Sequence, residues 1–225
     1  MNYRHELKFF ITDREFEVIR YRLQPLLRPD IHQNGNSYTV RSLYFDDFQD
    51  TCRMENEDGI GNRQKTRIRI YNGDDTLIKL EQKIKNRERI CKEVNFLSKA
   101  ACMAYMKGKA GNPTKISSKQ ERVLYTKIQV KGMHPVCIVE YERTAWVEPK
   151  GNVRITFDKN ISGSNHVEHF LDKRIMPVPL LPRGISILEI KYDALFPQYL
   201  YEALNIGTLQ RCSFSKYYYA RAVIA

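Results

Sequence analysis

The chain has 225 residues, of which 42% are hydrophobic and 11% aromatic, enough apolar material for a core and a composition that excludes wholesale disorder. Lysine and arginine number 37 against 26 aspartates and glutamates, and the formal charge of +11 predicts an anionic partner: nucleic acid, an anionic membrane surface or a polyphosphorylated molecule. Five cysteines without a CxxC spacing argue against a disulfide framework or a zinc site. No apolar run approaches the roughly 18 residues of a membrane span, and the start lacks the apolar region of a signal peptide. We therefore expect a cytoplasmic protein.

The N-terminal part of the chain predicts two strands with a helix between them. Residues 3–11, "YRHELKFFI", alternate in the manner of a strand. Thr12 and Glu15 then have the spacing of a capping box, ahead of the amphipathic segment 16–27. Residues 37–47, "SYTVRSLYFDD", predict the next strand.

A hairpin and a further strand follow. Residues 61–85 alternate in both halves, and Asn72-Gly73 between the halves is a strong signal for a tight turn. Residues 89–97, "RICKEVNFL", predict another strand. A helix from a Ser98 cap to about residue 106 comes next.

The remaining elements complete the predicted domain. A helix over residues 122–130 is preceded by Ser118 and Glu121, which repeat the capping spacing. The other expected elements are a hairpin over 135–161, a loop over 162–183, a strand over 186–193, a helix from Pro197 to Gly207 and a helical tail over 213–225. Strands with helices between groups of them predict a single α+β domain over residues 1–225, built around an antiparallel sheet or barrel with the helices packed outside.

Charged side chains recur on one face of many of these strands. In "KTRIRIY" the residues Lys65, Arg67, Arg69 and Tyr71 share a face, opposite to Ile68 and Ile70. The same alternation groups Arg4, Glu6 and Lys8; Lys79, Glu81, Lys83 and Lys85; Tyr141 and Arg143; Arg154, Thr156 and Asp158; and Glu189 and Lys191. For any one strand, a face in contact with water is the simpler interpretation.

Two features favour a buried, polar lumen for the set as a whole. The faces are mostly cationic, and two like charges about 6 Å apart repel by roughly 3 kcal/mol at an effective dielectric constant near 20. An anion that binds between them removes this repulsion. The opposite faces are apolar, so helices are expected to cover them and leave the charged faces lining the inside of a closed sheet.

Such a lumen suits phosphate compounds. Arginine forks and lysine charges hold phosphate oxygens. Carboxylates in the same cavity bind Mg²⁺ or Mn²⁺, which bridge phosphates to protein. Glu6, Glu81 and Glu189 are the candidate carboxylates, and the alternative for each is an ion pair with a neighbouring lysine.

Nine short segments in register resemble one family. They are "ELKF", "SLYFDD", "RIRIY", "LEQKIK", "CKE", "VEYERTAW", "VRITFD", "LEIKY" and "FSKY". Their order resembles that of VTC domains, the polyphosphate polymerase members of the CYTH-like triphosphate tunnel metalloenzymes, from residue 3 to about residue 219. The resemblance implies an antiparallel β-barrel tunnel, a bound Mn²⁺ or Mg²⁺, and elongation of polyphosphate from the γ-phosphate of ATP.

The resemblance also implies site residues. The positions similar to the family's catalytic cations are Lys8, Arg67, Arg69, Lys83, Lys92, Arg143, Arg154, Lys191 and Lys216. Tyr141 and Ser215 match substrate-binding positions, and Glu6 and Glu81 join them as carboxylates of the same cavity. Glu189 resembles the metal-binding glutamate. Alternation places Lys92 on the face of Val94, which leaves open whether it points into the tunnel.

The departures from the family and its relatives limit the function. His5 and Arg4 precede Glu6 in place of the E-x-E-x-K of many tunnel hydrolases, which removes one metal carboxylate and disfavours triphosphate hydrolysis. We expect no membrane module within these 225 residues, and a membrane partner is compatible with the domain. The expected function is therefore a metal-dependent polyphosphate polymerase. The alternatives are an inorganic or nucleoside triphosphatase of the same fold and a non-catalytic binder of polyphosphate or nucleic acid, with nucleic acid the less expected ligand.

Overall fold

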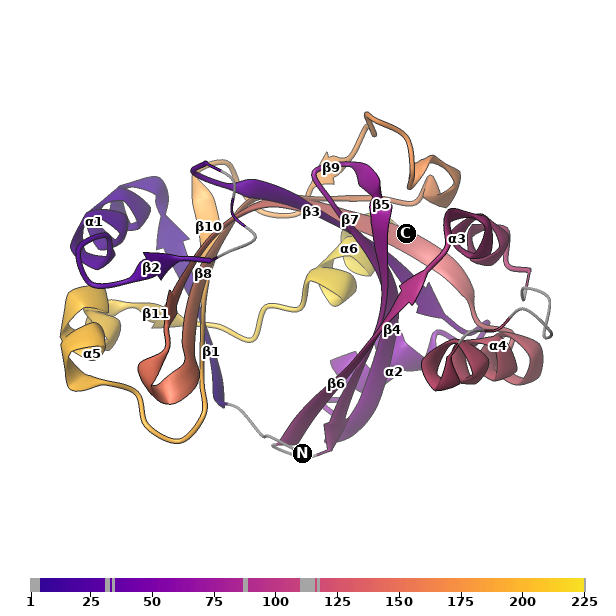
Figure 1. Cartoon of the computed structure of the whole chain (residues 1–225), viewed down its shortest axis with the longest axis horizontal. Coiled ribbons are helices and arrows are strands. Elements are labelled where there is room, and N and C mark those ends of the chain that lie inside the picture. Colours follow the sequence, from indigo (N-terminus) through magenta and orange to yellow (C-terminus); the bar gives the residue numbers. More distant parts are fainter. Residues whose placement is uncertain are drawn as a thin grey trace. The chain divides into compact units, whose positions relative to one another are not determined.

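The structure is a computed structural model that describes residues 5–30, 33, 35–86, 89–109, 116 and 118–224 (Figure 1). The chain folds into two compact units. Unit 1 comprises residues 1–39, 141–161 and 181–215, and unit 2 comprises residues 40–140, 162–180 and 216–225. Two long strands, β7 (His134–Glu148) and β8 (Val153–Ser164), contribute residues to both units. Arg4 and His32 lie outside the described residues.

Unit 1 is an antiparallel sheet covered by helices. Its strands follow the order β11-β1-β10-β8-β7, with the two-residue strand β2 paired to β7. The bounds are β1 (His5–Thr12), β2 (Arg28–Pro29), β10 (Ile185–Tyr192) and β11 (Gln210–Arg211). The helices are α1 (Asp13–Leu23) and α5 (Gln198–Leu204).

The core of unit 1 is made by the apolar rows of its strands and the inner faces of its helices. Phe9 and Ile11 of β1 alternate with residues that are less buried, and they pack in one cluster with Phe16 of α1, Phe157 of β8 and Leu200 of α5. Burial of this row fixes the pleat, because a slip of one residue would turn every side chain to the other face. The charged residues of the same strands therefore lie on the face away from these helices.

Unit 2 repeats this plan with its own helices. Its strands follow the order β7-β3-β4-β5-β6, and β9 pairs with the end of β8. The strands are β3 (Tyr38–Asp46), β4 (Asn62–Tyr71), β5 (Asp74–Asn86), β6 (Arg89–Leu97) and β9 (Val178–Pro179). The helices are α2 (Thr51–Glu57), α3 (Lys99–Met106), α4 (Lys119–Lys131) and α6 (Lys216–Ile224).

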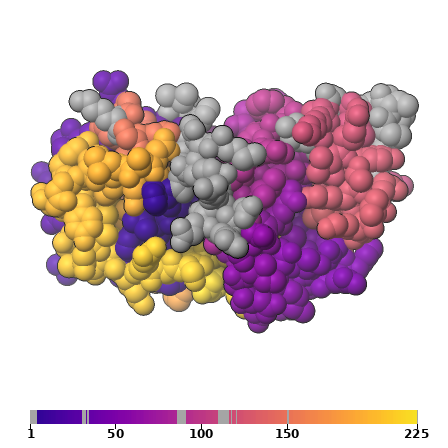
Figure 2. Space-filling view, turned by 90° about the horizontal axis from the view of Figure 1, so that it is seen from below, coloured from indigo at the N-terminus to yellow at the C-terminus, as the bar shows by residue number. Residues whose placement is uncertain are grey.

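The core of unit 2 lies between its strands and the helices α3 and α4. Ile68 of β4 and Leu80 of β5 are fully buried, and they pack with Tyr105 of α3 and Leu124 of α4. The residues of α4, pink in Figure 2, lie on the surface of this unit beside the magenta segment that precedes them. The two helices thus cover the apolar face of the sheet and leave the opposite face, which carries Arg67 and Arg69, to other contacts.

The predicted fold class, α+β with antiparallel strands and helices packed on the apolar side, is confirmed. In the part of the chain that the structure describes, the sheet runs from β11 at one edge to β6 at the other, and these two edge strands do not pair with each other. Strand pairing therefore does not form the expected closed sheet. Each unit buries its apolar rows under its own helices, and burial therefore does not require closure. A single domain over residues 1–225 stays a prediction.

The boundaries of several elements differ from those expected. Helix α1 ends at Leu23, with Gln24 as its C-cap, because the next residue, Pro25, has no N–H to donate to the helix. Helix α5 ends at Leu204, where Asn205 takes the left-handed conformation with φ of 52° ahead of the expected stop at Gly207. Helix α2 was not predicted at all: it buries none of its residues, and so it has no apolar period to read.

The segment over residues 162–183 is partly ordered into strands. Strand β8 continues to Ser164 and pairs with β9, which corrects the expectation of a loop over the whole segment. The remainder of the segment contains a 3-10 helix over Val167–His169. Among the described residues, no helix is long and apolar enough to cross a membrane.

The capping box at the start of α1 yields a prediction about stability. Thr12 Oγ1 accepts from the Glu15 N–H at 3.2 Å, and Glu15 Oε2 accepts from the Thr12 N–H at 2.7 Å. We expect Thr12→Ala to lower the free energy of unfolding by about 1 kcal/mol, because the Glu15 N–H loses the Thr12 hydroxyl as its acceptor, while the N–H of residue 12 still donates to Glu15. Urea unfolding measures the change.

The matched control is Thr126→Ala in the middle of α4. The Thr126 hydroxyl donates to the Arg122 carbonyl one turn earlier, a bond that adds little to a helix. We expect this variant to be at least as stable as the unaltered protein. Equal losses in the two variants would contradict a specific role for the cap.

Candidate functional site

Strand pairing in unit 1 brings charged residues of β1, β10 and β8 into adjacent rows. Lys8 lies opposite Glu189, which lies opposite Thr156. Glu6 lies opposite Lys191, which lies opposite Arg154. Residues directly opposite in an antiparallel pair point to the same face. The sequence-predicted residues of these strands are therefore brought together on one face.

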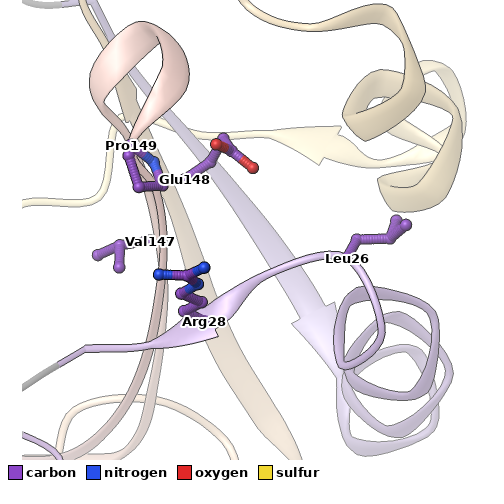
Figure 3. A pocket seen from close by; sticks show the side chains of 5 residues that line it. All are labelled: Leu26, Arg28, Val147, Glu148 and Pro149. Atoms are coloured by element: carbon purple, nitrogen blue, oxygen red, sulfur yellow. The ribbon is translucent and has the colours of Figure 1, made fainter.

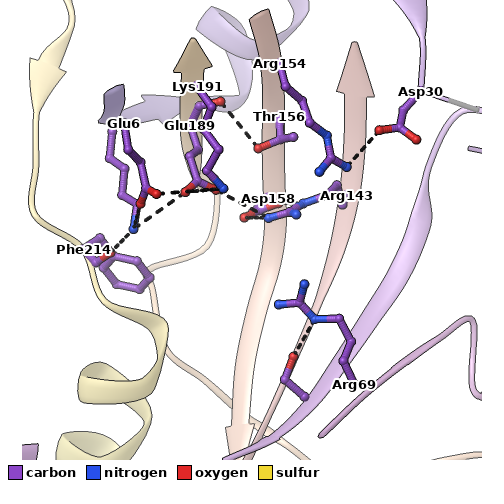
Figure 4. A network of polar contacts seen from close by, with 12 residues as sticks. Glu6, Asp30, Arg69, Arg143, Arg154, Thr156, Asp158, Glu189, Lys191 and Phe214 are labelled. Atoms are coloured by element: carbon purple, nitrogen blue, oxygen red, sulfur yellow. Dashed lines mark hydrogen bonds and ion pairs between the residues drawn. The ribbon is translucent and has the colours of Figure 1, made fainter. Parts of the chain in front are cut away.

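Two ammonium groups and two carboxylates alternate in this cluster (Figure 4). Lys8 Nζ lies 3.2 Å from Glu6 Oε1 and 4.0 Å from Glu189 Oε1. Lys191 Nζ lies 3.1 Å from Glu189 Oε1 and 4.0 Å from Glu6 Oε2. Burial lowers the pKa of Lys8, but the carboxylates of Glu189 and Glu6 outweigh it and raise that pKa above its ordinary value. Lys8 thus stays charged, and it also donates to the Phe214 carbonyl at 3.0 Å.

Arg143 is the most deeply buried cation among the described residues of unit 1. Its Nε and Nη2 donate to the two carboxylate oxygens of Asp158 at 2.7 and 2.8 Å, and its Nη2 lies 3.7 Å from Glu189 Oε2. Asp158 is fully buried. Burial works against the charge of Arg143, but Asp158 outweighs it and raises the pKa of the guanidinium. Asp158 therefore fixes the fork of Arg143, whose guanidinium carbon lies 5.1 Å from the centre of the Tyr141 ring.

Arg154 is held at the other side of the same face. Its Nη2 lies 2.9 Å from Asp30 Oδ2 and 3.1 Å from the Tyr38 hydroxyl. Figure 4 shows the guanidinium directed at the Asp30 carboxylate. About a third of the Arg154 side chain remains exposed, so it is open to a ligand on this face as well as to Asp30.

Unit 2 carries a second cluster, centred on a buried carboxylate. Glu81 Oε2 accepts from Arg67 Nε at 2.7 Å and lies 3.4 Å from Arg69 Nη1, while Glu81 Oε1 lies 2.6 Å from Lys92 Nζ. Burial raises the pKa of the Glu81 carboxyl, but Arg67, Arg69 and Lys92 outweigh it and hold that pKa well below its usual range. One carboxylate against three cations leaves this cluster positive.

The arginines of this cluster have further partners that set their orientation. Arg67 Nη1 donates to the Tyr44 hydroxyl at 3.0 Å, and Arg69 Nε donates to Ser42 Oγ at 3.1 Å. Both partners lie on β3, directly opposite the arginine that they bind. The two guanidiniums are thus fixed at successive positions of one strand face, and an arginine fork is a group that can bind a phosphate through two parallel hydrogen bonds.

The orientation of Lys92 is resolved by strand pairing. Lys92 lies opposite Lys83, which lies opposite Lys65, so three ammonium groups form one row across β4, β5 and β6. Lys92 shares its face with Val94, as alternation required, and that face is the one that carries Glu81.

The last two predicted residues lie where α6 begins. Ser215 belongs to unit 1 and Lys216 to unit 2, and both are half-buried. The next residue, Tyr217, is buried and packs on Tyr44, with ring centres 5.3 Å apart, and its hydroxyl donates to Asp46. Tyr217 therefore anchors the start of α6 on the charged face of unit 2.

Several residues of these clusters were not predicted as site residues. Asp158 follows Arg154 at four residues on one strand face, so alternation alone was enough to find it. Alternation also placed Lys65 on the face of Arg67 and Arg69, so it could have been predicted as a site residue from the sequence. Asp30 lies after α1 in a segment with no period, and only tertiary pairing with Arg154 reveals it.

The fit of Mg²⁺ or Mn²⁺ rests on the oxygen donors of unit 1. No group of three or more His, Cys, Asp or Glu residues able to hold a metal occurs among the described residues. Glu6 and Glu189 share Lys8 and Lys191 as neighbours, each within 4.0 Å, and both carboxylates lie on this face. Mg²⁺ is commonly held by one or two carboxylates plus phosphate oxygens and water. These two carboxylates therefore fit such an ion in the presence of a phosphate ligand.

A pocket of about 350 Å³ in unit 1 is a different feature (Figure 3). It is lined by Leu26, Arg28, Val147, Glu148 and Pro149, where β2 pairs with the end of β7. None of these residues was predicted for the site. Its lining has one cation and one carboxylate, so it lacks the excess positive charge that phosphate requires.

Comparison with known proteins gives a family and a fold. A family model described as the VTC domain matches residues 3–225. Among solved structures, a "putative adenylate cyclase" from Bacillus halodurans has a TM-score of 0.52 and 11% identity, over 92% of this chain and 87% of that chain. The PH1819 protein from Pyrococcus horikoshii has a TM-score of 0.48 and 14% identity, over 95% of each chain. No curated protein sequence matches the chain significantly. At these identities the structural likeness shows the fold alone.

The Arg143–Asp158 pair yields a prediction about stability. We expect Asp158→Ala to lower the free energy of unfolding by about 3–5 kcal/mol, because a buried guanidinium is left without its carboxylate. Guanidinium chloride unfolding measures the loss. The control is Glu17→Gln on the exposed Arg20–Glu17 pair of α1, for which we expect a change of about 0.5 kcal/mol or less. A loss below about 1 kcal/mol for Asp158→Ala would show that the pair does not hold unit 1 together.

Proposed function

The chain belongs to the VTC domain family, and from that premise we propose that it is a metal-dependent polyphosphate polymerase that transfers the γ-phosphate of ATP onto a growing chain. Family membership supports an enzyme that acts on triphosphate or polyphosphate compounds. The observation that carries the proposal is the set of cation rows that strand pairing fixes on the face opposite the helices, above all Arg67 and Arg69 with Lys65, Lys83 and Lys92. A tunnel formed by these faces stays a prediction.

The proposed chemistry is positioning and charge neutralisation. The guanidiniums of Arg67 and Arg69 hold phosphate oxygens of ATP, and the lysine row beside them binds the neighbouring phosphates. In unit 1, Arg143, Arg154 and Lys8 supply the same chemistry to phosphates of the chain. The terminal oxygen of the acceptor forms a bond to the γ-phosphorus, the bond from that phosphorus to the bridging oxygen breaks, and ADP leaves. No nucleophile from the protein is required.

Glu189, with Glu6 beside it, is the proposed holder of Mn²⁺ or Mg²⁺. When bound, the ion would neutralise charge that develops on the transferred phosphoryl group. The residues of the chain have their own part in this step. Lys191 and Lys8 each lie within 4.0 Å of both carboxylates, so they hold these oxygens in place before any ligand binds.

Incubation with ATP and Mn²⁺ tests the proposed reaction. We expect a product ladder of polyphosphate on a gel, with one ADP formed for each phosphate added. Arg67→Lys serves as the matched variant, since it keeps the charge, loses the fork and is expected to make far less product while folding normally. Free phosphate without a ladder would establish a triphosphatase in place of the polymerase. Tight anion binding without turnover would establish a non-catalytic binder.

The role of Glu189 is tested by Glu189→Gln. If Glu189 only pairs with cations, this change leaves phosphate binding equal or tighter and turnover intact. If it holds the metal, we expect turnover to fall about 10²–10³-fold, or roughly 3–4 kcal/mol of transition-state stabilisation, while ATP still binds. Rates over a range of Mn²⁺ concentrations, with ATP affinity measured by calorimetry, separate the two roles.

The control for this experiment is Glu142→Gln. Glu142 is exposed on β7 and accepts a hydrogen bond from the Asn160 side chain. Its change to glutamine removes the same single negative charge as Glu189→Gln. We expect its turnover and its metal dependence to match those of the unaltered protein. Full turnover of Glu189→Gln at ordinary metal concentrations would place the metal elsewhere.

A further inference from the structure

The charged face of unit 2 continues beyond its cations onto exposed apolar side chains of β6. Phe96 is 58% exposed and Val94 is 41% exposed. Phe96 lies opposite Lys79, which lies opposite Arg69. Val94 lies opposite Glu81, which lies opposite Arg67. Each of these two arginines of β4 therefore lies in the same cross-strand row as an apolar side chain of β6, two strands away.

Phe96 is exposed although the strand that carries it is well packed on its other face. The residues on either side of Phe96 in β6 point to the opposite face of the sheet and make contacts there. Asn95 donates to the Ser118 hydroxyl at the start of α4, and Leu97 is buried in the core of unit 2. The strand is thus fixed by its helix-covered face. That fixes Phe96 on the opposite face, beside the cation rows.

Single exposed apolar residues are common on proteins and carry no argument by themselves. The position of Phe96 does carry one, because it is an aromatic ring at a set distance from a cluster suited to phosphates. Two strand spacings of about 4.8 Å separate its backbone from that of Arg69, or roughly 10 Å in all. A ligand that combines a flat ring with a chain of phosphates matches such a surface, and a nucleoside triphosphate is a ligand of that chemistry.

We propose that Phe96 is the platform on which the base of the donor nucleoside triphosphate stacks, while its phosphates lie on Arg67, Arg69 and Lys83. This inference rests on the proposed function and adds to it the means by which the enzyme distinguishes a nucleotide from a bare phosphate chain. Val94, in the adjacent row, lies beside the ribose. Stacking on an aromatic ring contributes binding free energy for every base, because each base has a π-face.

The nature of the platform sets its specificity. A phenyl ring offers no hydrogen-bonding group, so Phe96 itself does not read the edges of the base. The site therefore accepts both purines, and it favours them over pyrimidines because their larger rings stack more extensively. It also binds ATP more tightly than tripolyphosphate, which occupies the cations and leaves the ring uncovered.

Phe96→Ala, compared with a matched control, tests the platform. Calorimetry measures the affinities for the non-hydrolysable ATP analogue AMP-PNP and for tripolyphosphate at equal ionic strength. We expect Phe96→Ala to weaken AMP-PNP binding by about 5- to 100-fold and to leave tripolyphosphate binding unchanged, as the usual value of stacking one base implies. The control is Phe48→Ala, which removes a ring that is 82% exposed elsewhere in unit 2, and it should change neither affinity.

Phe96→Trp supplies a spectroscopic readout that a merely structural role would not give. The chain has one tryptophan, Trp146, which is buried, so a new tryptophan at position 96 reports on its own surroundings. We expect this variant to keep the affinity for AMP-PNP and to show fluorescence quenching with AMP-PNP and not with tripolyphosphate.

The outcomes separate this inference from the proposed function. Unchanged AMP-PNP affinity in Phe96→Ala, or equal losses for the two ligands, overturns the platform and leaves the phosphate site standing. No binding of either ligand by the unaltered protein overturns both. Selective loss of AMP-PNP binding together with selective quenching in Phe96→Trp supports the platform.

Discussion

The structure depends on the lateral pairing of strands that each carry cations on one face and apolar side chains on the other. Pairing places residues directly opposite one another at a fixed spacing, so cations that are scattered along the sequence become neighbours. Lys65, Lys83 and Lys92 come from three strands and form one row for this reason. Their mutual repulsion is tolerated because burial of the opposite face, with Ile68 and Leu80 in the core, fixes the register.

The carboxylates make this arrangement stable in the absence of a ligand. Asp158 accepts hydrogen bonds from two nitrogens of the Arg143 guanidinium. Glu81 forms ion pairs with three cations, Arg67, Arg69 and Lys92. A buried ion pair adds little net stability compared with apolar residues of the same size, because both charges lose their water. Its value here is orientation: the carboxylates hold the guanidiniums in place, and under the proposed function less ordering would be required when phosphate binds.

Much of the fold and of the candidate site followed from local pattern. Alternation found the charged faces of β1, β4, β5, β8 and β10, and the capping signals at Thr12, Ser98 and Ser118 marked helix starts that the structure confirms. What the sequence could not supply arises from contacts distant in the chain. Asp30 reaches Arg154 only through tertiary structure, and Lys92 meets Glu81 only because β5 pairs with β6 in one register. Helix α2 has no buried residue, and therefore left no period to detect.

The central claim is that these strand faces bind a chain of phosphates. A crystal structure of the protein with tripolyphosphate and Mn²⁺ tests it most directly. The account predicts phosphate oxygens within hydrogen-bonding distance of Arg67, Arg69 and Lys83, with the Glu81 contacts to the arginines lengthened or shared, and Mn²⁺ on Glu189. Phosphates bound only to surface lysines, with the Arg67–Glu81–Lys92 cluster unchanged and no metal at Glu189, would contradict it.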